Sequence, residues 1–210
     1  MFKHVICDDH KALQLGLNAL QDWSNKWLLK LNILKCKTVF FGRNINKNYT
    51  YSVQGTQLER LEHMKDLGVI FDSELNFVQH CKENINTAIS YLGIIKRNFV
   101  CLDEDAFVML YKSLVRSHLE YANSVWNPHR RGLIKDLEKV QMRATKLVIT
   151  IKNLTYKDSL KRLKLPTLKY RRIRGDMIEV YKILTNKYDS RVNLYLEKQQ
   201  DSITRDHSLN

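Results

Sequence analysis

Glycine and proline are scarce in this sequence. Only 7 glycines and 2 prolines occur among 210 residues, although 44% of the residues are hydrophobic. A chain with so few turn-forming residues places most of its length in long helices, and its apolar content is sufficient for a buried core. We therefore expect a mainly α protein.

Cysteines are few and widely separated, at positions 7, 36, 81 and 101. They form no CxxC pair, and no histidine completes a zinc-binding spacing, so we expect reduced thiols and no metal site. No segment approaches the roughly 20 apolar residues that a membrane span needs, and the N-terminus lacks the apolar core of a signal peptide. These absences predict an intracellular protein, cytoplasmic or nuclear.

Positive charge is in excess, with a formal net charge of +13. The excess is regional, because residues 128–182 contain 16 Lys and Arg against 5 Asp and Glu, a local balance of +11. Such a surface attracts a polyanion, since each neutralised phosphate releases counterions. Nucleic acid is therefore the first partner to consider, and a merely solvated helix face is the alternative.

Two adjacent carboxylates, Asp8 and Asp9, follow an apolar stretch near the N-terminus. A two-metal polymerase holds its cations with such a pair, on a turn with apolar strand residues on both sides. Here the downstream side is helical instead, with an apolar stripe at Leu13, Leu17, Leu20, Trp23, Trp27 and Leu31. We therefore expect a helix over 9–30 that one of the two carboxylates caps, and no metal site.

The segment after this helix has short β patterns at 36–42, near 49–53 and at 66–71. Together they predict a small antiparallel sheet remnant with one covering helix. From residue 77 onward the pattern is helical and predicts a thumb-like bundle of about four or five helices. The expected apolar stripes are Ile85, Ala88, Ile89, Leu92 and Ile95; Phe107, Leu110, Leu114, Tyr121 and Val125; and Ile134, Leu137, Val140, Ala144 and Leu147.

Helix ends in this region carry recognisable signals. Residues 103–105 (Asp-Glu-Asp) place negative charge at the start of the second helix, and Pro128 ends it. Thr155 and Asp158 form a variant capping box before a short helix over 155–163. A last long helix is expected from Leu168 to Leu184.

Five segments resemble the non-LTR (LINE-type, jockey-like) retrotransposon reverse transcriptases. LNALQDWSNKWLLKLNILKCKTVFFGR (17–43) resembles the segment after the catalytic aspartates, and KDLGVIFDSELNFVQHC (65–81) resembles the primer-grip hairpin. LVRSHLEYANSVWNP (114–128), LEKVQMRATKLV (137–148) and RRIRGDMIEVYKIL (171–184) resemble the helical thumb and its extension. The resemblance implies a C-terminal fragment made of a palm edge and a thumb.

The resemblance also assigns roles to residues. The catalytic hairpin would precede Met1, so the metal-binding aspartates are absent and no cofactor is expected, although the parent family uses Mg²⁺. Lys35 matches the lysine that would protonate the departing pyrophosphate, and a solvated strand lysine is the alternative. Leu67, Gly68 and Val69 match the primer-grip hairpin, where a glycine permits close approach of another backbone, as it does in a simple turn.

Basic residues of the thumb-like region would rest on the template–primer backbone, because guanidinium groups suit phosphates. An intramolecular pair between Arg174 and Asp176, or neighbouring carboxylates, is the alternative, and Trp126 and Tyr121 are expected to be core anchors. The candidate nucleic-acid-binding residues are Arg130, Arg131, Arg143, Lys146, Lys161, Arg162, Lys164, Lys169, Arg171, Arg172 and Arg174.

These observations predict three parts: a palm-edge remnant (1–75), a helical thumb-like domain (76–188) and a polar tail (189–210). The leading hypothesis is a truncated RNA-directed DNA polymerase that binds RNA or DNA template–primer and is not an enzyme by itself. A stand-alone helical nucleic-acid-binding protein and a relic without function are the alternatives. No membrane association is expected, and the oligomeric state stays open.

Overall fold

The computed structural model describes residues 9–42, 48–185 and 187. The chain divides into two compact units, residues 1–87 and 88–210, and the division falls within helix α2 (Val78–Asn98). We call them the first and second units and describe each by itself. The predicted boundary at 75/76 stays a prediction, and the predicted tail over 189–210 lies outside the described residues.

Helix α1 (Asp9–Lys26) ends earlier than the predicted residue 30. Leu28 has a positive φ of 55°, the Leu29 N–H donates to the Ser24 carbonyl (2.9 Å) and the Leu28 N–H donates to the Asn25 carbonyl (3.3 Å). This is the Schellman arrangement, which satisfies the last carbonyls and turns the chain away. Asp9 is the first residue of α1, and Asp8 lies outside the described residues.

Helix α1 contacts strand β2 (Ser52–Val53) through polar side chains. The Gln14 amide donates to the Ser52 carbonyl (2.9 Å) and accepts from the Ser52 N–H (3.0 Å), and Gln21 Oε1 accepts from the Gln54 N–H (2.9 Å). Much of the predicted apolar stripe therefore stays uncovered, since Trp23 and Trp27 are 50% and 61% exposed.

The described strands of the first unit form two-stranded ladders. The remaining elements are η1 (Ile33–Lys35), β1 (Lys37–Val39), β3 (Thr56–Gln57), β4 (Glu59–Leu61), β5 (His63–Asp66) and β6 (Val69–Asp72). β2–β3 and β5–β6 pair antiparallel as expected, but β1–β4 is parallel, with Lys37 opposite Glu59. The predicted strand over 66–71 is interrupted, because Leu67 and Gly68 form the turn between β5 and β6.

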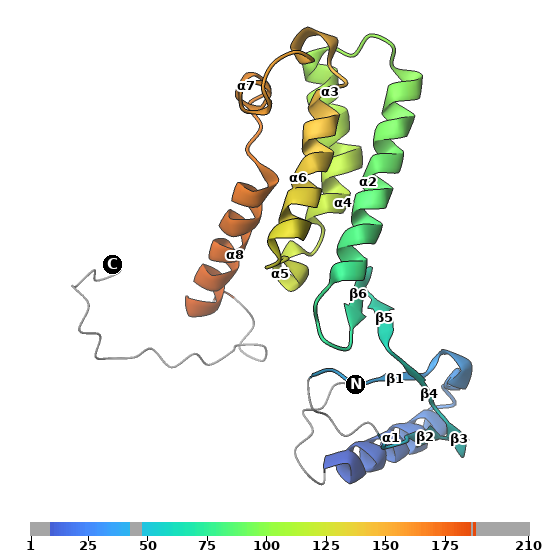
Figure 1. Ribbon diagram of the computed structural model, residues 1–210. Coiled ribbons are helices and arrows are strands. Elements are labelled where there is room, and N and C mark those ends of the chain that lie inside the picture. The colour runs from blue at the N-terminus through green and yellow to red at the C-terminus, as the bar shows by residue number, and fades with distance from the viewer. Residues whose placement is uncertain (1–8, 43–47, 186, 188–210) are drawn as a thin grey trace, which may run out of the picture. The chain divides into compact units, whose positions relative to one another are not determined.

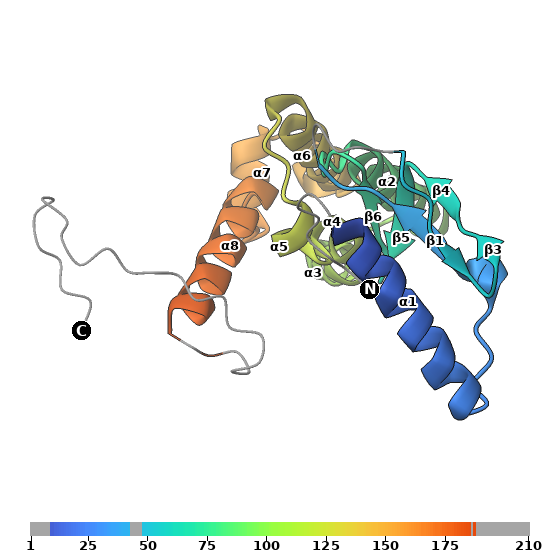
Figure 2. The ribbon, with the colours of Figure 1, turned by 90° about the horizontal axis from the view of Figure 1, so that it is seen from below.

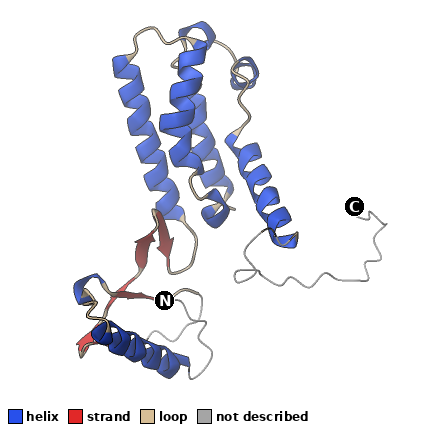
Figure 3. Cartoon of the chain, turned by 180° about the vertical axis from the view of Figure 1, so that it is seen from behind, coloured by secondary structure: helices blue, strands red, loops and turns tan. Residues whose placement is uncertain are grey.

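Helices dominate the described residues, and the predicted mainly α fold with a small β remnant is confirmed (Figures 1 and 3). Besides α2, the second unit contains α3 (Glu104–Leu110), η2 (Tyr111–Arg116), α4 (Ser117–Glu120), α5 (Asn123–Trp126), α6 (Arg131–Thr145), η3 (Ile149–Ile151), α7 (Tyr156–Arg162) and α8 (Leu168–Leu184). The bounds of α8 are those predicted.

Side-chain caps set the helix starts that the sequence predicted. The Asp103 carboxylate accepts from the Ala106 N–H (2.8 Å), and the Thr155 hydroxyl accepts from the Asp158 N–H (3.3 Å). Thr167 caps α8 in the same way, accepting from the Tyr170 N–H (3.1 Å). Each cap satisfies a backbone donor that the first turn leaves without an intrahelical partner.

The predicted apolar stripe at Leu110, Leu114, Tyr121 and Val125 was largely wrong. The buried positions are Phe107, Tyr111, Val115 and Leu119, spaced by four residues. The reason is η2, a π-helical turn, because its wider winding carries every fourth residue to the same face. The chain then breaks at Ala122 (φ 51°), which leaves Tyr121 and Val125 exposed and begins the separate helix α5.

The buried core of the second unit includes residues of α2, α3, η2, α4 and α6. Trp126 is fully buried and its indole N–H donates to the Tyr121 carbonyl (2.6 Å), as expected of a core anchor. The buried Tyr111 hydroxyl donates to Gln141 Oε1 (2.7 Å), and the Gln141 amide donates to the Pro166 carbonyl (3.0 Å). This link ties α6 to the loop before α8. Helix α8 itself lies beside α5 and α6 (Figure 2).

Candidate nucleic-acid interface

The primer-grip-like hairpin of the first unit is β5–β6, with Asp66 opposite Val69. Its tip residues, Leu67 and Gly68, have φ values of 44° and 82°, as both central residues of a type I′ turn require. Leu67 and Gly68 are exposed, whereas Val69 is buried. The three predicted residues therefore divide into an accessible tip and a core anchor.

A histidine holds this hairpin to the start of α2. The Ile70 N–H donates to His80 Nδ1 (3.3 Å), and the Asn84 amide contacts His80 Nε2 (2.9 Å). Burial lowers the pKa of His80, because desolvation disfavours the imidazolium. The neutral ring is the form that accepts the backbone hydrogen bond, so the anchor depends on its protonation state.

Lys35 lies on the short helix η1 rather than on a strand. Its backbone N–H donates to the Asn32 carbonyl (3.1 Å) and to Asn32 Oδ1 (3.3 Å), and its side chain is exposed. Among the described residues, no group of three or more His, Cys, Asp or Glu side chains is placed to hold a metal ion.

Helix α6 presents a basic stripe, of which only Arg131 and Arg143 were predicted. Arg131, Lys135, Lys139 and Arg143 follow one another at intervals of four, and all four are exposed. Lys139 also pairs with Asp136 (2.8 Å), but both side chains are about half exposed, so the pair is weak. Lys135 and Lys139 were missed, and the four-residue spacing from Arg131 to Arg143 was the signal that could have found them.

Two predicted basic residues have structural roles. The Lys146 ammonium donates to the Lys152 and Leu154 carbonyls (both 2.7 Å), which closes the loop after α6. Arg162 Nε lies 2.8 Å from Glu104 Oε1 and so links α7 to the start of α3. Both side chains are exposed, but phosphate would have to compete with these partners.

Two further candidates belong to the packing of α8. Arg171 donates two hydrogen bonds to the Glu120 carboxylate, one of them 2.9 Å long, and this bonding raises the pKa of Arg171. Arg172 is only 1% exposed. A guanidinium that is buried, or that already grips a carboxylate, is poorly placed to contact phosphate on the surface.

The remaining candidates are exposed on the second unit. The carboxylate of Asp176 accepts a hydrogen bond from the Asn127 amide, and the described residues show no ion pair between Asp176 and Arg174. The exposed set consists of Arg130 and the stripe on α6, Lys161 and Lys164 around the end of α7, and Lys169 and Arg174 on α8.

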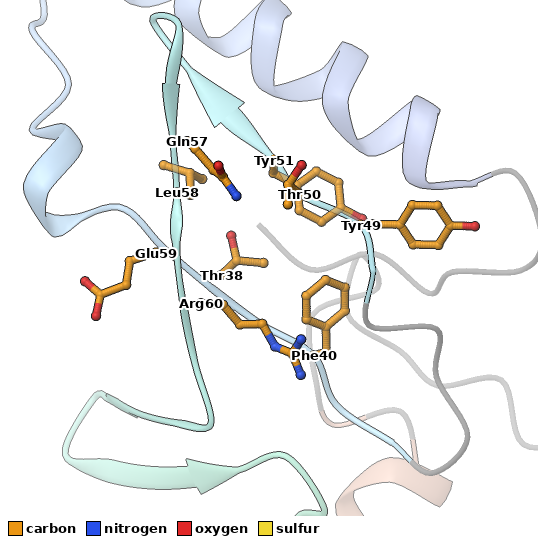
Figure 4. A pocket seen from close by; sticks show the side chains of 9 residues that line it. All are labelled: Thr38, Phe40, Tyr49, Thr50, Tyr51, Gln57, Leu58, Glu59 and Arg60. Carbon is orange, nitrogen blue, oxygen red and sulfur yellow. The ribbon is translucent and has the colours of Figure 1, made fainter.

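A cavity of about 390 Å³ opens beside the ladders of the first unit (Figure 4). The guanidinium of Arg60 lies 5.3 Å from the centre of the Phe40 ring, and Glu59 points away from the aromatic side chains toward its ion-pair partner Lys37. The lining residues are Thr38, Phe40, Tyr49, Thr50, Tyr51, Gln57, Leu58, Glu59 and Arg60. None of them is a predicted site residue.

The amino-acid sequence of this chain is similar to those of two known polymerases. It is 31% identical over 135 residues to the RNA-directed DNA polymerase from mobile element jockey of Drosophila funebris, covering 62% of this chain and 14% of that protein. The polymerase of the same name from Drosophila melanogaster is 25% identical over 193 residues, 88% of this chain and 20% of that protein. The chain is related to the jockey reverse transcriptases.

The resemblance inferred from the five sequence segments is thereby confirmed. The chain spans only 14% and 20% of the length of the two jockey polymerases. An uncharacterized protein of Caenorhabditis elegans is also similar, at 27% identity over 128 residues, 60% of this chain and 65% of that protein. No family model and no solved structure matches the chain. In the described residues, no helix is long and apolar enough to cross a membrane.

Proposed function

We propose that this chain is a palm-edge and thumb segment of a jockey-like reverse transcriptase that binds template–primer nucleic acid but does not polymerise by itself. Its relationship to the jockey polymerases supports the reverse-transcriptase origin. The observation that carries the binding proposal is the basic stripe of α6, because four exposed cations on one helix face form a continuous track for phosphates.

The dimensions of the stripe suit a nucleic acid backbone. Arg131 and Arg143 are twelve residues apart, which corresponds to about 18 Å along a helix. Over that length a duplex presents about ten phosphates. The stripe has no base-reading pattern of paired amide and guanidinium groups, so we propose contact with the backbone and no sequence preference.

Features of the first unit support the proposal that polymerisation needs further palm residues. The β1–β4 ladder is a parallel pair of three-residue strands, whereas parallel sheets normally occur with more strands and with both faces covered. The exposed Trp23 and Trp27 leave the apolar side of α1 without cover from the described residues. Both features fit a part of a larger palm, in which Lys35 would lie near the metal-bound leaving group.

The test of binding is a titration of the purified chain with a short primer–template duplex at low and high salt. We expect micromolar affinity that falls with salt, because counterions are released from the phosphates. Arg143→Glu is the informative variant, and Arg97→Glu is its matched control: both arginines are exposed near the end of a helix, but Arg97 lies outside the basic region of residues 128–182.

Arg143→Glu should weaken binding and reduce the slope of log affinity against log salt by about 1, whereas Arg97→Glu should leave both nearly unchanged. Equal effects of the two variants would assign binding to net charge alone and refute the proposed track. Absence of salt-dependent binding at micromolar concentrations would favour a relic without function. DNA synthesis by the purified chain would contradict the dependence on further palm residues.

A further inference from the structure

The outward side of α8 is apolar, although the described part of the chain leaves it exposed. Leu168 and Arg172 are buried on the inward side. On the opposite side, all of the following residues are between 39% and 65% exposed: Tyr170, Ile173, Met177, Val180 and Leu184. A surface helix normally carries polar residues on that side, so an apolar outward face indicates a missing partner.

The spacing of these residues indicates what kind of partner fits. From Tyr170 to Leu184 the intervals are three, four, three and four, which is the a/d pattern of a coiled-coil seam over two heptads. Such a seam packs against another helix of the same periodicity. We call it the α8 seam.

We propose that the α8 seam pairs with the same seam of a second copy of this chain, in antiparallel orientation. A seam packed against itself is self-complementary, as a twofold interface requires. The exposed fractions of its residues, with the neighbouring Tyr181, correspond to roughly 600 Å² per copy, so complete burial in a pair would cover about 1,200 Å², the lower limit for specific interfaces. The dimer is therefore weak and concentration-dependent, and it is independent of the proposed nucleic-acid binding.

Charges beside the seam select the orientation. In a parallel pair, Lys169 of one copy would lie against Arg174 of the other, at the flanking positions that meet in parallel coiled coils, and the two cations would repel. In an antiparallel pair centred near Met177, Arg174 meets the exposed Tyr181 ring of the second copy, a cation–π contact. The antiparallel pair also opposes the two helix dipoles.

The test is sedimentation equilibrium of the full chain from about 1 to 200 μM, after nucleic acid has been removed at high salt. We expect a monomer–dimer equilibrium with a dissociation constant of tens of micromolar. Met177→Glu should raise that constant at least about tenfold, because the dimer would bury the new charge. The matched control is Met109→Glu on α3, because Met109 and Met177 are 67% and 65% exposed.

Arg174→Glu tests the orientation by the sign of its effect. It should weaken an antiparallel dimer, which loses the contact with Tyr181, but strengthen a parallel one by attracting Lys169. A chain that stays monomeric at 200 μM, or a dimer that Met177→Glu leaves intact, would overturn the proposal. Loss of nucleic-acid binding in Met177→Glu without any change in association would assign the seam to nucleic acid instead.

Discussion

Replacing Glu138 on α6 with glutamine should destabilise the second unit by about 1–2 kcal/mol. The Glu138 carboxylate accepts hydrogen bonds from the Leu168 N–H (3.3 Å), the Lys169 N–H (3.2 Å) and the Tyr156 hydroxyl. It therefore supplies negative charge at the N-terminus of α8 and joins α6 to α7 and α8. Burial and, next in importance, the hydrogen bond to Glu138 raise the pKa of Tyr156. Its hydroxyl therefore keeps its proton and remains a donor.

The magnitude follows from what glutamine keeps and loses. Hydrogen bonds to a charged group contribute about 1.5–3 kcal/mol against about 0.5–1.5 kcal/mol for neutral ones, and a carboxylate at a helix N-terminus adds about 0.3–1 kcal/mol. Glu138→Gln keeps the shape but loses the charge, and it replaces one acceptor oxygen with an NH₂ group that cannot accept a hydrogen bond. Glu138→Ala, which leaves three donors without this acceptor, should cost about 3 kcal/mol.

The fluorescence of Trp126 provides the assay. This indole is fully buried in the second unit, whereas Trp23 and Trp27 of the first unit are already exposed. Urea unfolding followed by the loss of buried-tryptophan emission therefore reports the second unit, and circular dichroism reports the whole chain. The control is Asp136→Asn on the same helix, which removes only an exposed ion pair.

Asp136→Asn should change the free energy of unfolding by less than about 0.5 kcal/mol. If Glu138→Gln and Asp136→Asn had the same effect, Glu138 would not be acting as the cap of α8. The reasoning would also be refuted if Glu138→Gln were neutral while Glu138→Ala was strongly destabilising, because packing rather than charge would then hold the three helices together.

Three further predictions concern single side chains. Because the pKa of His80 is lowered in the folded state, its contribution to stability is complete above the pKa of the unfolded state, about 6.5, and is lost as the pH falls through the pKa of the folded state. Amide-exchange protection of β6 should therefore decrease toward about pH 5. Leu67→Asn should stabilise the β5–β6 hairpin by about 0.5–1 kcal/mol in thermal unfolding, because asparagine tolerates the positive φ at this position better than leucine; destabilisation would contradict the type I′ assignment. Arg171→Lys should cost about 1–3 kcal/mol in urea unfolding, because lysine cannot reproduce the two-pronged contact with Glu120, whereas Arg174→Lys should be neutral; equal effects would contradict the structural role of Arg171.

Local signals were sufficient to predict the starts of several helices, although not the end of α1. Thr155 acts as the predicted cap, Asp103 lies at the predicted acidic helix start, and α8 runs from Leu168 to Leu184 as its periodicity indicated. These features depend on interactions within one or two turns, which a sequence displays directly. The relationship to the jockey polymerases was likewise predictable, because it depends on the order and spacing of residues along the chain.

The errors concern features that a periodic residue pattern does not encode. A π-helical turn shifted the buried stripe to Tyr111 and Val115, and a parallel β1–β4 ladder replaced part of the expected antiparallel sheet. Periodicity assumes uniform winding, and strand patterns do not specify the direction of the partner. Neither assumption could be checked before distant segments were brought together.

The sequence by itself determined the helical character of the chain, its caps, its regional positive charge and its relationship to jockey polymerases, because composition and local spacing encode these properties. Only the tertiary structure decided which cations face solvent. Arg171 and Arg172 lie between the exposed Lys169 and Arg174 in the sequence, but Arg171 binds Glu120 on another helix and Arg172 is buried. The partner and the burial of a side chain come from distant segments, and a charge count cannot reveal them.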